Sequence, residues 1–341
     1  MPETSFHTIV IGAGPAGLTC ATALAEAGRQ VLLLERRPEI GPKVCAGGLP
    51  GSTMALLDLP ESLIERRFVR QRIVSGWQRV ELAAREPMVC TVNRKKLGQW
   101  MAERATAAGV TILTGVAAQR IDALCVHTSQ GTFRAEYLVG ADGSSSLVRR
   151  ALGLPTTRVG IGLHHQLPGD FAAMLWHLDP RRMGNGYAWI FPHRESASVG
   201  LYSAAGDLSP QLLQEKLHHF AARYGMDLQT APPRAARISF DYRGWRFGKT
   251  FLVGDAAGLA SGLTGEGIYA AVVSGEIVAR TILDPAYTDS RLNALLAQHR
   301  RHERILRLSD RSRWSCSLIL ETLVAALRCG LIKHTALELG G

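Results

Sequence analysis

The chain of 341 residues lacks the long uncharged hydrophobic run that a transmembrane helix requires. Near the C-terminus the sequence SLILETLVAAL is apolar, but it is short and contains Glu321, whereas a helix that spans a bilayer takes about 20 apolar residues. The N-terminus lacks the basic start, apolar core and cleavage site of a secretory signal peptide, because glycines break its apolar run. These absences predict a cytoplasmic protein whose contact with a membrane, if it has one, is peripheral.

Metal-binding patterns are also missing. The six cysteines are dispersed and contain no CxxC spacing, which favours free thiols over a metal site. Two histidine pairs, at 164–165 and 218–219, have no carboxylate or cysteine at ligand spacing, so we interpret them as surface or core histidines. The sequence therefore predicts no metal centre.

The net charge of +10 does not come from a basic tract. Most of the cations are arginines, they are scattered, and they are not interleaved with aromatic residues. Zinc-finger, homeodomain and RNA-recognition signatures are absent, so we expect no nucleic-acid partner. An anionic cofactor or an acidic lipid surface accounts better for the charge.

The N-terminal part has the pattern of one βαβ unit. A strand at 8–11 leads into a glycine turn at 12–17, an alanine-rich helix at 18–27 and a buried strand at 31–34. Gly12 permits the tight turn, Gly14 lets a pyrophosphate approach the backbone, and Gly17 lets the helix lie close to the sheet. Glu35 ends the second strand, where a carboxylate accepts hydrogen bonds from ribose hydroxyls. The acid favours FAD or NAD over NADP at this site.

Two further buried strands end in turns that carry an aspartate. The sequence YLVGADGS at 137–144 contains Asp142 and Gly143, and TFLVGDAA at 250–257 contains Gly254 and Asp255. Asp255 is placed to bind a ribityl or ribose hydroxyl, and a helix starting near Gly265 would aim its N-terminal dipole at a phosphate or at the flavin.

The remaining pattern combines helices with a second sheet. Apolar spacing predicts a helix at 94–108 and short strands at 110–114, 124–128 and 133–139. Alternation between about 159 and 204 predicts an antiparallel sheet, followed by a helix at 209–224. A strand at 250–253, a glycine-rich turn into a helix within 254–283, and basic helices over 289–335 complete the chain.

The order GxGxxG, ADG and GDAA resembles that of the p-hydroxybenzoate hydroxylase-like flavoproteins, over residues 7–283. Two segments narrow this resemblance to the geranylgeranyl reductase family. KVCAGG at 43–48 is similar to the family's KxCGGG-type loop, and YAWIFP at 187–192 matches its YxWxFP motif. The chain departs from the family at Ala46, where a glycine is usual, and at His193, where a lysine often follows.

The resemblance implies a set of site residues. It places Cys45 at the flavin, where a thiol acts as an acid, as a redox partner or in packing. It implies that an aromatic wall for a substrate channel is built from Tyr187, Trp189, Phe191 and Pro192. It further implies that FAD is bound by Gly12, Gly14, Pro15, Ala16, Gly17, Glu35, Arg36, Cys45, Ala46, Gly47, Gly48, Arg94, Ala118, Asp142, Gly143, Gly254, Asp255, Gly265, Gly267 and Ile268.

The implied activity is saturation of prenyl double bonds in an isoprenoid diphosphate, quinone or lipid, with hydride from reduced flavin N5. Electrons would come from NADPH or a ferredoxin-like redox protein, and basic C-terminal helices would face anionic headgroups. Alternatives are an FAD-dependent monooxygenase or halogenase acting on an aromatic or polycyclic substrate, and a flavin electron carrier without its own substrate. The sequence leaves the oligomeric state open.

The predicted fold class is α/β, with a Rossmann-type FAD-binding domain interleaved with an antiparallel β-sheet substrate domain and a short helical C-terminal tail. We assign FAD-binding segments to 1–75, 91–158 and 246–285, substrate-domain segments to 76–90 and 159–245, and C-terminal helices to 286–341.

Overall fold

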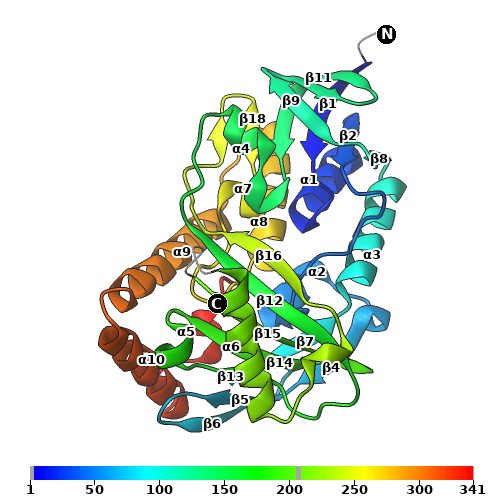
Figure 1. The fold of residues 1–341 in the computed structure, drawn as a ribbon. Coiled ribbons are helices and arrows are strands. Elements are labelled where there is room, and N and C mark those ends of the chain that lie inside the picture. The colour runs from blue at the N-terminus through cyan, green and yellow to red at the C-terminus, as the bar shows by residue number, and fades with distance from the viewer. Residues whose placement is uncertain (1–3, 205–208, 341) are drawn as a thin grey trace.

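The computed structural model describes residues 4–204 and 209–340. A mostly parallel sheet and a mostly antiparallel sheet form the two ends of the molecule, and helices α9 and α10 run along one side (Figure 1). The chain passes between the two sheets four times, so the predicted interleaving of an FAD-binding fold with a second sheet is confirmed.

The parallel sheet has the strand order β17-β18-β11-β1-β2-β8, with β10 and β9 attached to β11. Its central strands are runs of Val, Ile and Leu that are buried on both faces, as expected where helices cover a parallel sheet. The strands are β1 (Thr4–Ile11), β2 (Val31–Glu35), β8 (Thr111–Thr114), β9 (Ala118–Asp122), β10 (Cys125–Thr128), β11 (Gly131–Gly140), β17 (Arg246–Phe247) and β18 (Thr250–Leu252).

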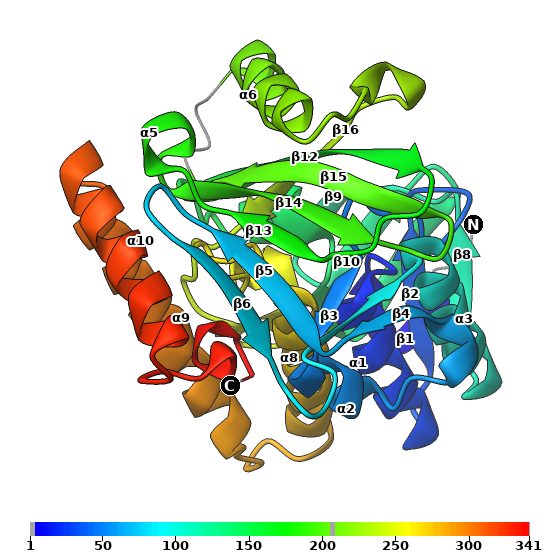
Figure 2. The same cartoon turned by 90° about the horizontal axis from the view of Figure 1, so that it is seen from below.

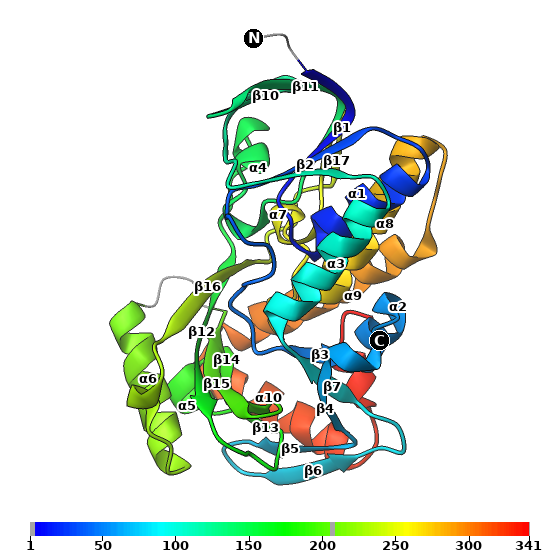
Figure 3. The ribbon, with the colours of Figure 1, turned by 90° about the vertical axis from the view of Figure 1, so that its right-hand side faces the viewer.

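Helices α1, α3 and α8 lie together on one face of this sheet (Figure 3). Gly275 of α8 lets α1 approach so closely that an added Cβ would be 2.4 Å from the carbonyl oxygen of Ala16. The helices of this part are α1 (Pro15–Glu26), α3 (Arg94–Ala107), η2 (Gly143–Ser145), α4 (Leu147–Ala151), α7 (Gly254–Ala257) and α8 (Ile268–Leu283).

The antiparallel sheet has the order β16-β12-β15-β14-β13-β5-β6, in which the β13–β5 pair alone is parallel among the described strands. Helix α6 covers one face (Figure 2), and residues of β14 alternate between this face and the opposite one. The elements are β5 (Arg70–Val74), β6 (Arg79–Ala83), β12 (Val159–Pro168), β13 (Leu175–His177), α5 (Pro180–Met183), β14 (Gly186–Pro192), β15 (Ser196–Ser203), α6 (Pro210–Arg223), η3 (Leu228–Thr230) and β16 (Arg234–Ser239).

The small sheet β3-β7-β4 and the C-terminal helices complete the fold. Within residues 4–204 and 209–340, no helix combines the length and apolarity that crossing a bilayer takes. The elements are β3 (Gly48–Pro50), α2 (Gly51–Leu57), η1 (Glu61–Leu63), β4 (Ile64–Phe68), β7 (Val89–Val92), α9 (Ser290–Ser309), α10 (Arg313–Arg328) and η4 (His334–Leu337).

Most predicted elements are confirmed within a few residues, and two features differ. The segment 254–283 holds two helices, because Gly258 has a left-handed φ of 76° and ends α7 against the backbone of Asp241. Strand β5 pairs with β6 and β13 in the antiparallel sheet, so the domain boundary that we place between residues 75 and 76 runs between two paired strands.

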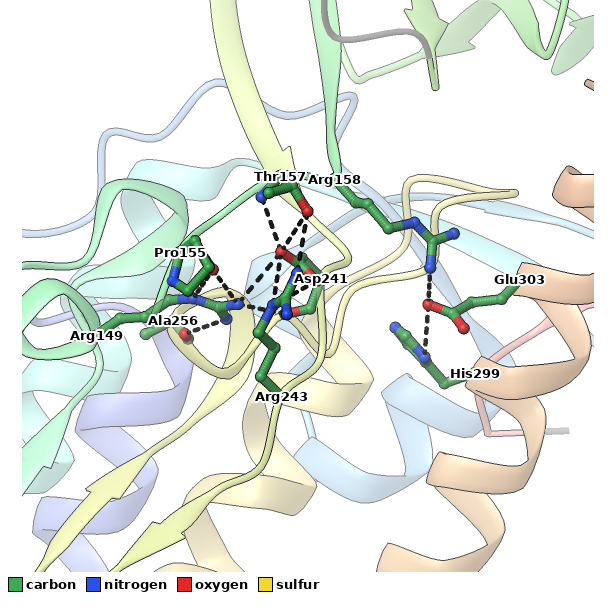
Figure 4. A network of polar contacts seen from close by, with 9 residues as sticks. All are labelled: Arg149, Pro155, Thr157, Arg158, Asp241, Arg243, Ala256, His299 and Glu303. Carbon is green, nitrogen blue, oxygen red and sulfur yellow. Dashed lines mark hydrogen bonds and ion pairs between the residues drawn. The ribbon is translucent and has the colours of Figure 1, made fainter. Parts of the chain in front are cut away.

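A buried arginine joins the segments that carry the two aspartate turns (Figure 4). Arg149 of α4 is 1% exposed, and its guanidinium donates to the carbonyl oxygens of Pro155, Asp241 and Ala256. It also lies 3.5 Å from the carboxylate of Asp241. That carboxylate accepts from the backbone N–H of Thr157 and from Arg243. One guanidinium thus ties α4 to α7 and to the chain that leaves β16.

We expect Arg149→Met to lower the free energy of unfolding by about 3–5 kcal/mol, because the substitution leaves buried carbonyl groups and a buried carboxylate without their donor. Arg150→Met is the matched control. The Arg150 side chain is exposed and donates to the carbonyl of Ser145, so its loss is expected to cost about 0.5 kcal/mol or less. Urea unfolding measures both, and equal effects would contradict this account.

Candidate active site

The turn between β1 and α1 is built from close backbone contacts. Gly12 has a φ of 107°, and a Cβ at this position would lie 2.4 Å from the carbonyl oxygen of Ala141. A Cβ on Gly17 would lie 2.0 Å from the carbonyl oxygen of Gly12. Both contacts are shorter than any side chain permits, so these two glycines serve the protein's own packing.

Gly14 has a different reason to be glycine. Its φ of −81° and ψ of 175° are open to any residue, and a Cβ there would meet no protein atom within 4 Å. The residue caps helix α1, whose first turn presents backbone N–H groups and a partial positive charge. Neither the chain's conformation nor its packing requires a glycine at this position, which is the expected pattern where a pyrophosphate lies against the backbone.

Glu35 lies beside this turn at the end of β2. Its carboxylate accepts from the backbone N–H of Ala13 at 2.9 Å and from that of Arg37 at 2.9 Å. These two bonds fix the carboxylate at the carboxyl edge of the sheet and leave lone pairs for ribose hydroxyl groups. Arg36, the next residue, is exposed.

The two aspartate turns follow β11 and β18, which are neighbours in the parallel sheet. Asp142 Oδ2 accepts from the backbone N–H groups of Leu147 and Val148, whereas its Oδ1 is buried without a partner. Asp255 Oδ2 lies 3.2 Å from the Ser144 hydroxyl and 3.4 Å from Lys43 Nζ. The ADG and GDAA turns therefore meet, and Lys43 brings the loop after β2 to them.

Two buried donor atoms of the Arg94 side chain have no hydrogen-bond acceptor. Arg94 begins α3 and lines the cavity described below, and its Nε and Nη1 atoms are out of solvent contact and unpartnered. An unpaired buried guanidinium is costly, and the phosphates of a dinucleotide would supply the missing acceptors. Together with the free space at Gly14, this observation fits the binding of FAD along the carboxyl edge of the sheet.

The loop at 43–48 is held by a contact between Ala46 and His193, the two residues that depart from the family motifs. His193 Nε2 lies 3.0 Å from the carbonyl oxygen of Ala46, and its Nδ1 pairs with Glu65. The hydrogen bond with His193 lowers the pKa of Glu65. Cys45 Sγ accepts from the backbone N–H of Gly47 at 3.4 Å. His193 thus fixes the backbone next to Cys45.

A cavity of about 330 Å³ lies between this loop, the antiparallel sheet and α10. Tyr187, Trp189 and Phe191 of β14 line it from one face of their strand, and Trp176 of β13 packs on Tyr187 and Phe191 with ring centroids 5.2 and 4.7 Å apart. Further from the loop the walls are aliphatic and come from β5, β6 and α10: Ile73, Leu82, Leu320, Leu323, Val324 and Leu327. The cavity therefore suits a long apolar molecule.

One acidic residue of this cavity escaped the sequence analysis. Glu266 lies in the GEG turn before α8, and its Oε2 accepts from the backbone N–H of Leu339 at 2.9 Å while its Oε1 is buried without a partner. Burial raises the pKa of Glu266 to about 7, helped by the neighbouring carboxylate of Glu338. The sequence signal that could have identified Glu266 is a carboxylate within an otherwise apolar and glycine-rich turn.

The structure gathers part of the predicted site at the cavity. Pro192 faces elsewhere, and its carbonyl accepts from the Thr91 hydroxyl. Ala118 begins β9 and does not border the cavity. Gly12, Gly14, Gly17, Glu35 and Asp142 lie along the sheet edge and do not border the cavity. The predicted residues that line it are Pro15, Cys45, Ala46, Gly48, Arg94, Tyr187, Trp189, Phe191, Asp255, Gly265, Gly267 and Ile268.

Comparison with known proteins gives matches along most of the chain. Residues 5–164 match the FAD binding domain family. Digeranylgeranylglycerophospholipid reductase 2 of Methanothermobacter thermautotrophicus is 31% identical over 304 residues, 81% of this chain and 78% of that protein. Geranylgeranyl diphosphate reductase of Rhodobacter capsulatus is 29% identical over 300 residues, 82% of this chain and 75% of that protein. The crystal structure of a geranylgeranyl bacteriochlorophyll reductase-like protein from Thermoplasma acidophilum has the same fold, with a TM-score of 0.74, 22% identity, and coverage of 99% of this chain and 90% of that chain.

We expect Gly14→Ala to weaken FAD binding by about tenfold or more, or ~1.4 kcal/mol, because the new methyl group occupies the space for the pyrophosphate. The stability of the cofactor-free protein should not fall, since no protein atom is near. Gly51→Ala is the control, because its Cβ has ordinary contacts at 3.7 Å. Titration with FAD and thermal unfolding measure both effects. Unchanged FAD affinity in Gly14→Ala would show that the pyrophosphate lies elsewhere.

Proposed function

The chain belongs to the geranylgeranyl reductase family of FAD-dependent oxidoreductases, and from that premise we propose that it saturates isolated double bonds of a prenyl chain held in the aromatic-lined cavity. The relatives named above carry reductase names for geranylgeranyl diphosphate and digeranylgeranylglycerophospholipid. The observation that carries the proposal is the shape and chemistry of the cavity, whose aromatic wall continues into an aliphatic one.

The chain's own residues divide into those that hold the cofactor and those that hold the substrate. The carboxylate of Glu35 would bind ribose hydroxyls, and the guanidinium of Arg94 would bind phosphate. The carboxylate of Asp255 would bind a further hydroxyl of the cofactor. Bound and reduced FAD supplies hydride to a carbon–carbon double bond. Tyr187, Trp189 and Phe191 keep water from the bound prenyl chain, and Cys45 lies in the wall beside them as an acid, a redox partner or a packing group.

Two electron donors suit this chain. NADPH would dock near the Asp142 turn, and an acidic ferredoxin-like protein would be attracted by the net charge of +10. Reduction of the bound flavin with each donor in turn separates them.

The reductase and the monooxygenase differ in their need for oxygen. We expect the reduced protein to be reoxidised under anaerobic conditions by geranylgeranyl diphosphate or a geranylgeranylated lipid, because hydride transfer to an alkene needs no oxygen. The flavin absorbance reports the reaction. Reoxidation that requires oxygen and yields a hydroxylated or halogenated product would contradict the proposal.

We expect Trp189→Leu to slow this reoxidation by about tenfold or more, since a smaller side chain leaves the prenyl chain loosely placed. Trp245→Leu is the matched control, because Trp245 packs on Phe251 in the core of the parallel sheet and outside the cavity. Both variants should retain FAD. Loss of flavin from Trp189→Leu, or equal rates in the two variants, would remove Trp189 from the substrate site.

We further propose that the outer face of α10 contacts a membrane surface containing anionic lipid. Trp314 and Leu318 lie one helical turn apart and are 76% and 63% exposed. The exposed cations Arg311 and Arg313 precede them in the sequence, and the exposed Arg328 ends the same helix, which suits anionic headgroups. The inner face of the same helix lines the cavity, so a prenyl lipid would pass from the bilayer along α10.

We expect the double substitution Trp314→Ser and Leu318→Ser to reduce binding to vesicles that contain anionic lipid by about tenfold, because both apolar anchors are lost. Leu212→Ser is the control, since Leu212 is a partly exposed residue of α6 on the other side of the antiparallel sheet. Cosedimentation with anionic and zwitterionic vesicles measures the effect. Undiminished binding of the double variant would contradict the assignment of this face.

A further inference from the structure

Glu266 lines the cavity, and one of its carboxylate oxygens is hydrogen-bonded while the other is buried without a partner. Oε2 accepts from the backbone N–H of Leu339, which anchors the chain end that follows η4. Oε1 has no hydrogen-bond partner and no contact with solvent. Glu266 is a lining residue of the cavity, and the fold forms a hydrogen bond to only one of its two carboxylate oxygens.

The groups that face Glu266 from neighbouring elements do not neutralise it. Glu338, from the C-terminal segment, is itself an acid and accepts from the Ser52 hydroxyl at 3.1 Å. Lys43, the cation of the adjoining loop, pairs with Asp255. Tyr187 and Tyr269 also interact with Glu266, and burial raises the pKa of each hydroxyl, so that both are uncharged. Among the described residues, no ion pair reaches Glu266.

Three other polar side chains of the cavity differ from Glu266 in their hydrogen bonding or charge. The Tyr187 hydroxyl donates to the carbonyl of Thr264, and the Tyr202 hydroxyl donates to that of Gly262. Burial and nearby positive charge lower the pKa of His164 to about 4, so that its ring is neutral, and Nδ1 contacts the Ser198 hydroxyl. The oxygen of Glu266 is the one carboxyl oxygen of the described cavity wall that is both buried and unpaired.

We propose that Glu266 is the acid that protonates the alkene in the reduction, an inference that rests on the proposed function. The O–H bond at Oε1 breaks and a C–H bond forms at one alkene carbon. The π bond opens, and the other carbon receives the hydride that reduced flavin supplies, which leaves the flavin oxidised. Glu266 remains as a carboxylate and takes a proton from solvent before the next turnover.

The pH dependence follows from the burial of this group. The pKa of Glu266 is raised to about 7, so the acid form is present below that pH and is lost as the pH rises through it. The rate of anaerobic reoxidation by the prenyl substrate should therefore fall above about pH 7. Glu338→Gln removes the negative neighbour that helps to raise the pKa of Glu266. The decline in the rate of this variant should therefore begin at a lower pH than in the wild type, while the two rates at acidic pH should be equal.

The central variant is Glu266→Gln, whose amide oxygen still accepts from Leu339 but whose side chain has no acidic proton. We expect it to bind FAD and to be reduced normally, and to be reoxidised by geranylgeranyl diphosphate about 10²-fold more slowly or worse. Glu266→Asp should recover part of the rate. Cys45→Ser serves as the competing variant, because Cys45 is the other candidate acid.

A readout apart from activity tests the protonation itself. Infrared difference spectra of the FAD-bound wild type should show a protonated carboxyl band that disappears with a midpoint near pH 7, and this band should be missing in Glu266→Gln. Absence of that band in the wild type, or a Glu266→Gln rate equal to the wild type, or loss of rate in Cys45→Ser alone, overturns the proposal. A wild type that no prenyl compound reoxidises overturns the proposed function and this proposal together.

Discussion

The buried guanidinium of Arg149 is the interaction on which the site depends. The parallel sheet supplies the ADG and GDAA turns from strands that are far apart in the sequence, and each turn leads into a short helix. Arg149 donates to backbone carbonyls on both sides and faces the carboxylate of Asp241, which also begins the return from the antiparallel sheet. Because a buried charge tolerates only a narrow geometry, this one side chain fixes the two turns relative to each other and to the second sheet.

A second constraint acts on the backbone around the cofactor. The glycines at 12 and 17 are required by contacts inside the protein, whereas the glycine at 14 and the unpartnered donors of Arg94 are explained by a ligand. The same division appears at the cavity, where the fold uses Oε2 of Glu266 and leaves Oε1 free. The open space at Gly14, two donors of Arg94 and Oε1 of Glu266 are thus not used by the fold itself.

Local patterns were sufficient to predict the elements that depend on local physics. The first βαβ unit, the helix at α3 and the alternation of β14 were found because periodicity and glycine turns are written within short windows. The pairing of β5 with β13 was beyond such windows, since it joins residues about a hundred positions apart. The contact of His193 with Ala46 and the folding of the C-terminal segment onto Glu266 are likewise tertiary. The family motifs single out Ala46 and His193 as departures, and the fold shows that these two residues are in contact.

In the proposed reaction, a double bond held in the cavity gains hydrogen and no oxygen. The direct measurement is the mass of the product that forms when the reduced protein reacts with geranylgeranyl diphosphate, first without oxygen and then under isotope-labelled oxygen gas. The account predicts a product heavier by two hydrogen atoms for each double bond lost, with the same mass in both atmospheres. A product that forms only under oxygen and carries the labelled atom would contradict it.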